Sequence, residues 1–132
     1  LVFSLSDRTE TASEEAKSFL QSVLHYTSNC EDNSGFIDIQ ELISSCYREE
    51  TCGGSSKADA CVVLNETLKG ILEESWQIGP DFPEKGYKLD IFSGQENILS
   101  LMKGNITRNY KSGRQILPEA GLQIEVIFNL YS

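Results

Sequence analysis

The sequence predicts a single α+β domain, in which disulfide-tied helices pack on one face of an antiparallel sheet of about three or four strands. Three observations lead to this fold class. All four cysteines lie between Cys30 and Cys61, hydrophobic residues in the first half recur at helical spacing, and the spacing becomes that of strands after the Gly- and Pro-containing segment 79–83. We therefore expect residues 1–78 to form a helical half and residues 86–132 a sheet half of one domain that spans all 132 residues.

The first predicted helix covers residues 7–29 and is expected to be the longest of the helices. Its hydrophobic residues recur three and four positions apart: Ala12, Ala16, Phe19, Leu20, Val23 and Leu24. Thr11 and Glu14 have the spacing of a capping box, but no glycine or proline precedes them, so we expect the helix to begin at or near the N-terminus. The mostly apolar residues 1–5 would then project as a stalk. The alternative is that they fold back as an edge strand or a core plug.

Two shorter helices are predicted to follow. The first covers residues 39–49, because Asp38 is a favourable N-cap and Glu41 stands three residues later, as in a capping box. The second covers residues 56–76 and places its apolar residues on one face. Gly70 interrupts this second helix, and a glycine inside a helix predicts close packing there.

The second half of the chain predicts an antiparallel sheet. Its strands are expected at residues 86–92, 98–103, 114–117 and 121–131. A hairpin loop joins the first two, a polar connection covers residues 104–113, and Pro118 is expected to end the third strand. In the last strand every second residue is hydrophobic, which is typical of a sheet with one face in solvent: Leu122, Ile124, Val126, Phe128 and Leu130.

The even number of cysteines predicts two disulfides in a protein that folds outside the reducing cytosol, with free buried thiols as the alternative. A zinc site would need more closely spaced cysteine pairs, and the single histidine, His25, lies in the first predicted helix. Four cysteines allow three pairings, which the sequence does not distinguish. The short flexible segment between Cys52 and Cys61 favours a bond between these two, which leaves Cys30 to pair with Cys46.

The net charge of −9 argues against a nucleic-acid partner, whose phosphates bind basic surfaces, and against an anionic membrane surface. No stretch has the length and apolar composition of a membrane helix. We therefore expect contact with a membrane only through an N-terminal segment that is missing from this sequence.

Basic residues gather in one short stretch that contains no acidic residue: Lys103, Arg108, Lys111 and Arg114. We expect them at one end of the sheet, as a contact for self-assembly or for other cell-surface proteins. A solvated surface without a partner is the alternative.

The segment C-E-D-N-S-G-F-I-D-I-Q-E-L, residues 30–42, resembles the calcium loop of the EF-hand family. The resemblance implies calcium ligands at Asp32, Ser34, Asp38 and Glu41 and at the backbone carbonyl of Phe36. The first ligand position, however, is occupied by Cys30, and helix initiation at Asp38 and Glu41 explains these two residues without a metal. We therefore expect no metal here and keep these five residues as weak candidates.

The sequence contains no motif of a nucleophilic hydrolase, a phosphate-binding loop, a dinucleotide site or a zinc protease. We accordingly expect no catalytic residues, no enzymatic activity and no cofactor. Two N-glycosylation sequons begin at Asn65 and Asn105, and Asn105, in a predicted polar turn, is the better candidate.

Four stretches carry a resemblance at the level of pattern: L-N-E-T-L-K-G-I-L-E-E-S-W-Q-I-G-P, G-Y-K-L-D-I-F, G-N-I-T and R-Q-I-L-P-E-A-G-L-Q-I-E-V-I-F-N-L-Y. Over residues 52–132 they look similar to archaeal secreted, membrane-anchored proteins of pilin-like organisation. The resemblance implies an ectodomain on the outer face of the cell, held by an N-terminal segment. This chain departs from the pattern by lacking that segment and by its additional cysteines, Cys30 and Cys46.

The resulting hypothesis is a non-enzymatic extracellular or cell-surface structural protein, the pilin-like ectodomain of an N-terminally anchored protein. The alternative is a secreted ligand-binding module with a degenerate EF-hand-like calcium loop at residues 30–41. An apolar run directly before Leu1 in the full-length protein would favour the first hypothesis, and a thermal shift with calcium tests the second.

Overall fold

A computed structural model describes residues 10–53, 57–119 and 122–132. Within these ranges the chain folds in the order β1 (Glu10–Ala12), α1 (Glu14–Leu24), β2 (Thr27–Asp32), β3 (Gly35–Asp38), α2 (Ile39–Tyr47), α3 (Ala60–Ser75), β4 (Gly86–Ser93), β5 (Glu96–Gly104), β6 (Tyr110–Glu119) and β7 (Leu122–Tyr131).

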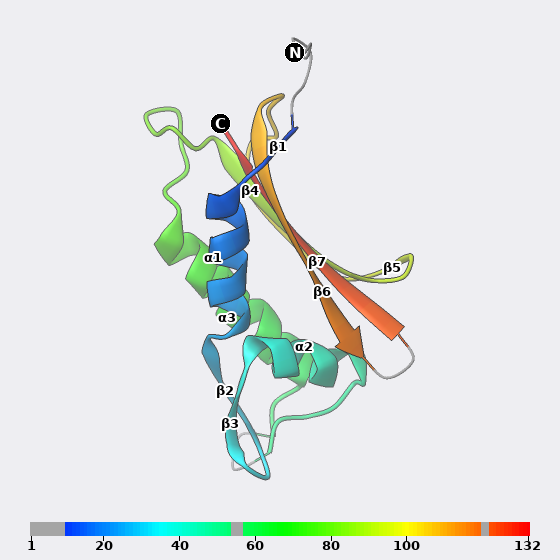
Figure 1. The fold of residues 1–132 in the computed structure, drawn as a ribbon. Coiled ribbons are helices and arrows are strands. Elements are labelled where there is room, and N and C mark those ends of the chain that lie inside the picture. Colours follow the sequence, from blue (N-terminus) through cyan, green and yellow to red (C-terminus); the bar gives the residue numbers. More distant parts are fainter. Residues whose placement is uncertain (1–9, 54–56, 120–121) are drawn as a thin grey trace.

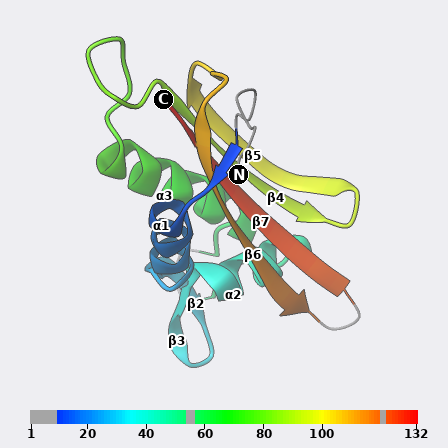
Figure 2. The ribbon, with the colours of Figure 1, turned by 45° about the horizontal axis from the view of Figure 1, so that its top comes forward.

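The predicted α+β class is confirmed, with the helices gathered on one face of the larger sheet (Figures 1 and 2). The order of strands in this sheet is β1-β6-β7-β4-β5, and β2 and β3 form a separate hairpin. All pairs in the larger sheet are antiparallel except β1 with β6, which is parallel. Within the described parts of the chain, no helix packs on the other face of the sheet in either view.

Alternating hydrophobic residues position the two central strands as predicted. In β7, Ile124, Val126 and Phe128 are buried, and in the register with β4 Val126 lies opposite Ile91 and Phe128 opposite Leu89. Because residues directly opposite each other point to the same face, these side chains form one apolar layer beneath the helices.

An aromatic cluster joins the helices to this layer. The ring of Phe19 in α1 lies 4.9 Å from that of Phe128 and 5.3 Å from that of Trp76, measured between centroids. Helix α1 crosses β6 at Gly113, where a Cβ atom would lie 2.7 Å from the carbonyl carbon of Ala16. The glycine therefore permits a backbone-to-backbone contact between helix and sheet.

The prediction of a long N-terminal helix that exceeds the other helices in length is wrong. Residues Glu10–Ala12 form a strand, and α1 begins after Ser13, whose side chain accepts a hydrogen bond from the backbone N–H of Ala16. The helix ends at Leu24, so α3, with 16 residues, is longer than α1, with 11. Pairing with β6 supplies the hydrogen bonds that hold β1 extended. The predicted stalk, residues 1–5, lies outside the described residues.

The third strand was predicted too short, and the hairpin β2–β3 lies inside the half that was predicted to be helical. Strand β6 already begins at Tyr110, within the predicted polar connection, and it continues through Pro118. Proline lacks an N–H but is tolerated where a strand has no neighbour on one side. Strand β1 pairs only with residues 110–112, so Pro118 has a strand neighbour on the β7 side alone among the described strands.

Candidate functional site

Two disulfides tie the helical layer together. Cys30 in β2 is bonded to Cys52, which follows α2, and Cys46 in the last turn of α2 is bonded to Cys61 in the first turn of α3. The expected disulfides are thus present, and their number fits an oxidising environment. The favoured pairing of Cys52 with Cys61 and of Cys30 with Cys46 is wrong.

The physical reason is that loop-closure entropy changes only slowly with loop length and so discriminates poorly between pairings. Hydrogen bonds position Cys52 instead: its backbone N–H donates to the Ala58 carbonyl, and the next N–H, of Gly53, donates to the Glu31 carbonyl. These bonds hold the segment after α2 against β2, next to Cys30. Among the described helices, none is long and apolar enough to cross a membrane.

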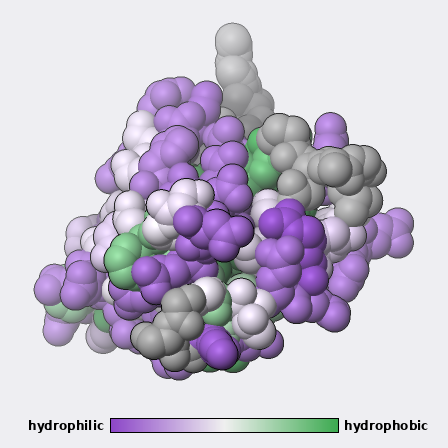
Figure 3. All heavy atoms as spheres, turned by 90° about the horizontal axis from the view of Figure 1, so that it is seen from below, coloured by the Kyte–Doolittle hydropathy of each residue, from purple (hydrophilic) through white to green (hydrophobic). Residues whose placement is uncertain are grey.

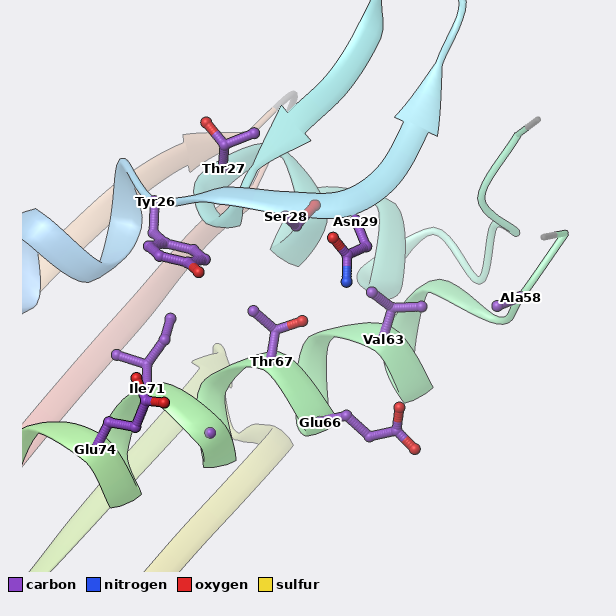
Figure 4. Close-up of a pocket in the computed structure, with 11 residues that line it drawn as sticks. Tyr26, Thr27, Ser28, Asn29, Ala58, Val63, Glu66, Thr67, Ile71 and Glu74 are labelled. Carbon is purple, nitrogen blue, oxygen red and sulfur yellow. The ribbon is translucent and has the colours of Figure 1, made fainter. Parts of the chain in front are cut away.

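A groove of about 400 Å³ runs between β2 and α3 and is a candidate binding site (Figure 4). Tyr26 and Asn29 project into it from the β2 side, and Thr67 and Ile71 project into it from α3. Eleven of the described residues line the groove: Tyr26, Thr27, Ser28, Asn29, Ala58, Val63, Glu66, Thr67, Gly70, Ile71 and Glu74.

The residues of α3 that line the groove form one stripe, at positions 63, 66, 67, 70, 71 and 74. This spacing of three and four places them on a single helix face. The opposite wall contains three consecutive residues, Thr27 to Asn29. Successive side chains of a strand point to opposite faces, so the groove follows the edge of β2 rather than one of its faces.

Gly70 lies in this stripe and has open space beside it. Apart from the adjoining backbone of α3 itself, no atom of the described residues comes within 4 Å of the position that a Cβ would occupy, so the close packing predicted at Gly70 is wrong. The glycine instead leaves the groove floor without a side chain.

The groove is acidic. Glu66 and Glu74 belong to its lining, and none of its eleven lining residues is basic. The hairpin end of the molecule is mostly hydrophilic, with hydrophobic residues in small separate patches (Figure 3). Sequence reasoning missed this groove; the available signal was an exposed helix stripe containing a glycine but no basic residue.

The candidate calcium ligands lie on the hairpin and at the start of α2. Asp32 is opposite Gly35 beside the turn, and its carboxylate accepts the N–H of Ser34, whereas Asp38 is opposite Thr27 at the other end. Five residues of strand separate these ends by about 16 Å. Ligands of one calcium ion lie about 2.3–2.6 Å from it, so this hairpin does not bring the two carboxylates together.

The same region confirms the predicted helix start. The Asp38 carboxylate accepts a hydrogen bond from the N–H of Glu41 at 2.9 Å, which makes Asp38 the N-cap of α2. Phe36, the predicted carbonyl ligand, has a side chain that is exposed on the hairpin. Among the described residues no group of three or more histidine, cysteine, aspartate and glutamate side chains could hold a metal ion.

The four basic residues share one end of the sheet only in part. Lys103 is the second-last residue of β5 and Lys111 the second residue of β6. Pairing through Tyr87 and Leu130 places them three strand spacings apart, about 14 Å. Arg108 lies in the loop that joins β5 to β6.

The two basic residues of β6 point to opposite faces and are both paired. Lys111 Nζ lies 2.9 Å from Glu15 Oε1 of α1, and this hydrogen bond raises the pKa of the Lys111 ammonium group. Arg114 forms an ion pair with Glu125 on the open face of the sheet. Lys111 and Arg114 therefore do not share one face of the sheet, and a partner contact by the four basic residues stays a prediction.

The two sequons lie near the β5 side of the molecule. Asn105 is exposed and directly follows β5, and Asn65 is half-buried in α3. Asn65 lines a hollow of about 480 Å³ between α3 and β5, together with Tyr87 and Glu73. Burial raises the pKa of the Tyr87 hydroxyl, and the nearby Glu73 carboxylate raises it further. Glycosylation at either site stays a prediction.

Comparison with protein-family models, with curated proteins and with solved structures finds no significant match for this chain. The resemblance to pilin-like proteins and every functional expectation based on it therefore stay predictions, and the candidate site stands on its geometry.

Proposed function

We propose that this chain is a non-enzymatic domain of a protein displayed on the outer surface of the cell, where it contacts other proteins. The observation that carries the proposal is the pair of disulfides. One joins β2 to the segment after α2, and the other joins α2 to α3. Such links form and persist outside the reducing cytosol. They also restrict the unfolded chain, which suits a domain that must stay folded without cellular chaperones.

The finer part of the proposal is a structural role in a surface-anchored, pilin-like protein. Its support is the packing of α1 across β6, with Ala16 against Gly113, which gives a helix laid on an antiparallel sheet. In this proposal an N-terminal segment anchors the domain, and the open face of the sheet is available to further copies or to other surface proteins. Because β1 precedes α1, such a segment would enter the domain through a strand rather than through an uninterrupted helix.

Labelling of intact cells tests this proposal. The full-length protein, expressed in the cells that produce it, should react with a membrane-impermeant amine reagent, whereas a cytosolic control protein should not. Peptide mapping without reduction should recover both disulfides from the labelled material. Protein that is labelled only after cell lysis and carries four free thiols would overturn the proposal.

A secreted ligand-binding module is the second candidate function, and the groove between β2 and α3 favours it. The groove volume of about 400 Å³ lies within the range of small-ligand sites. In this candidate the groove takes the role that the sequence had suggested for residues 30–41.

A further inference from the structure

We propose that the groove between β2 and α3 binds an extended polypeptide segment that carries two basic side chains four positions apart. The inference rests on the second candidate function, a ligand-binding module, and names the class of its ligand. It is independent of whether the domain is anchored or secreted.

The extended shape of the ligand follows from the shape of the groove. Strand β2 pairs with β3 on one edge, and among the described strands it has no other neighbour. The groove runs along β2, where Thr27 to Asn29 line it in succession. An added strand can use the main-chain groups of such an edge. From Val63 to Glu74 the α3 wall is about 16 Å long, which an extended chain covers with about five residues.

The spacing of the acidic residues sets the position of the basic side chains. Glu66 and Glu74 are eight helix positions apart, which corresponds to about 12 Å along α3. In an extended chain, side chains four positions apart point to the same face and are separated by about 13 Å. A segment with lysine or arginine at these two positions therefore matches the spacing of the two glutamates along α3, and no basic residue of the groove lining opposes it.

The groove also has cross-linked walls and an open floor, which allow a peptide backbone to come close. Cys30 fixes β2 and Cys61 fixes the start of α3, so both walls are cross-linked to the same part of the fold. Gly70 leaves the floor open, with no atom within 4 Å of a Cβ position. Tyr26, half exposed beside the groove, offers an aromatic face to the aliphatic part or the charge of a basic side chain.

The test uses the disulfide-intact domain and three fluorescent peptides of serine and glycine. One carries lysines four positions apart, one carries lysines at adjacent positions, and one carries glutamates four positions apart. Binding is measured by fluorescence anisotropy at low salt. We expect the first peptide to bind best and the glutamate peptide not to bind. Glu66→Gln and Glu74→Gln should each weaken binding about two- to fivefold, the range for exposed charge pairs.

Two variants separate groove binding from general attraction to an acidic protein. Gly70→Leu fills the floor and should abolish binding without lowering the melting temperature, because leucine favours a helix over glycine. Glu73→Gln removes the same charge from the neighbouring hollow and should leave binding unchanged. Failure of the lysine peptide to bind, or equal binding to wild type and Gly70→Leu, would overturn the inference. Surface labelling of intact cells is unaffected by either result, so it tests the surface proposal separately.

Discussion

Exchange of Gly113 for alanine should destabilise the protein through the contact between α1 and β6. A Cβ at this position would lie 2.7 Å from the carbonyl carbon of Ala16, 2.8 Å from its oxygen and 2.9 Å from the nitrogen of Lys17. All three are backbone atoms, so a rotamer change does not relieve the clash. To regain the 3.4 Å of an ordinary contact, α1 would have to move away from the sheet by about 0.7 Å.

That displacement acts on a close-packed interior. The ring of Phe19 on α1 packs against Phe128 and Trp76, so the helix cannot move without loosening these contacts. Overpacking of a core costs about 1–3 kcal/mol of unfolding free energy. For a domain of this size each kcal/mol corresponds to about 3–4 °C in melting temperature, so Gly113→Ala should lower it by roughly 3–12 °C.

Gly70→Ala is the matched control, because it makes the same chemical change in a helix where no atom lies within 4 Å of the new Cβ. It should raise the unfolding free energy by up to about 1 kcal/mol, the helix propensity difference between alanine and glycine. Urea unfolding of the oxidised proteins, followed by fluorescence of the single tryptophan, Trp76, measures both changes. If both variants are equally stable, or if Gly113→Ala is the more stable, the argument from the helix–sheet contact is refuted.

Three further predictions concern the disulfides, Tyr87 and calcium. Replacement of both Cys46 and Cys61 by serine should lower the unfolding free energy by about 2–4 kcal/mol in urea titrations; an unchanged midpoint would contradict a native bond between them. The pKa of Tyr87 is raised in the folded state. The contribution of Tyr87 to the unfolding free energy should therefore be fully present below about pH 10 and be lost as pH rises through that raised pKa. Tyr87→Phe should reduce this fall, and an identical pH profile would exclude a contribution from Tyr87. Calcium at 1 mM should leave the melting temperature unchanged, whereas a micromolar site at residues 30–42 would add about 4 kcal/mol and reveal itself as a clear upward shift.

Local patterns predicted the elements whose stability depends on near neighbours. The alternation of β7 placed Ile124, Val126 and Phe128 correctly in the core, because burial of every second residue follows from the pleat itself. The start of α2 was predicted at Asp38 because an N-cap bonds to an N–H only three residues away. In both cases the deciding interaction lies within the segment or follows from its own periodicity.

The errors fall where distant segments decide the structure. Residues Glu10–Ala12 fit a helical pattern in sequence, but pairing with β6, a hundred positions later, makes them a strand. Pro118 stands inside β6 because β1 ends before reaching it. The sequence did not predict the candidate site for the same reason, since the groove exists only because α3 lies beside the edge of β2.

The sequence by itself determined that this protein is an acidic α+β domain with an even set of cysteines, and hence that it suits an oxidising environment. Composition and short-range periodicity suffice for this, because each reflects the solvation of a residue or its immediate neighbours. Only the tertiary structure decided which cysteines are bonded, that a strand precedes α1, and that β2 and α3 enclose an acidic groove. These features depend on contacts between segments far apart in the chain. The energies of such contacts combine packing and loop closure, so no local sequence pattern predicts them.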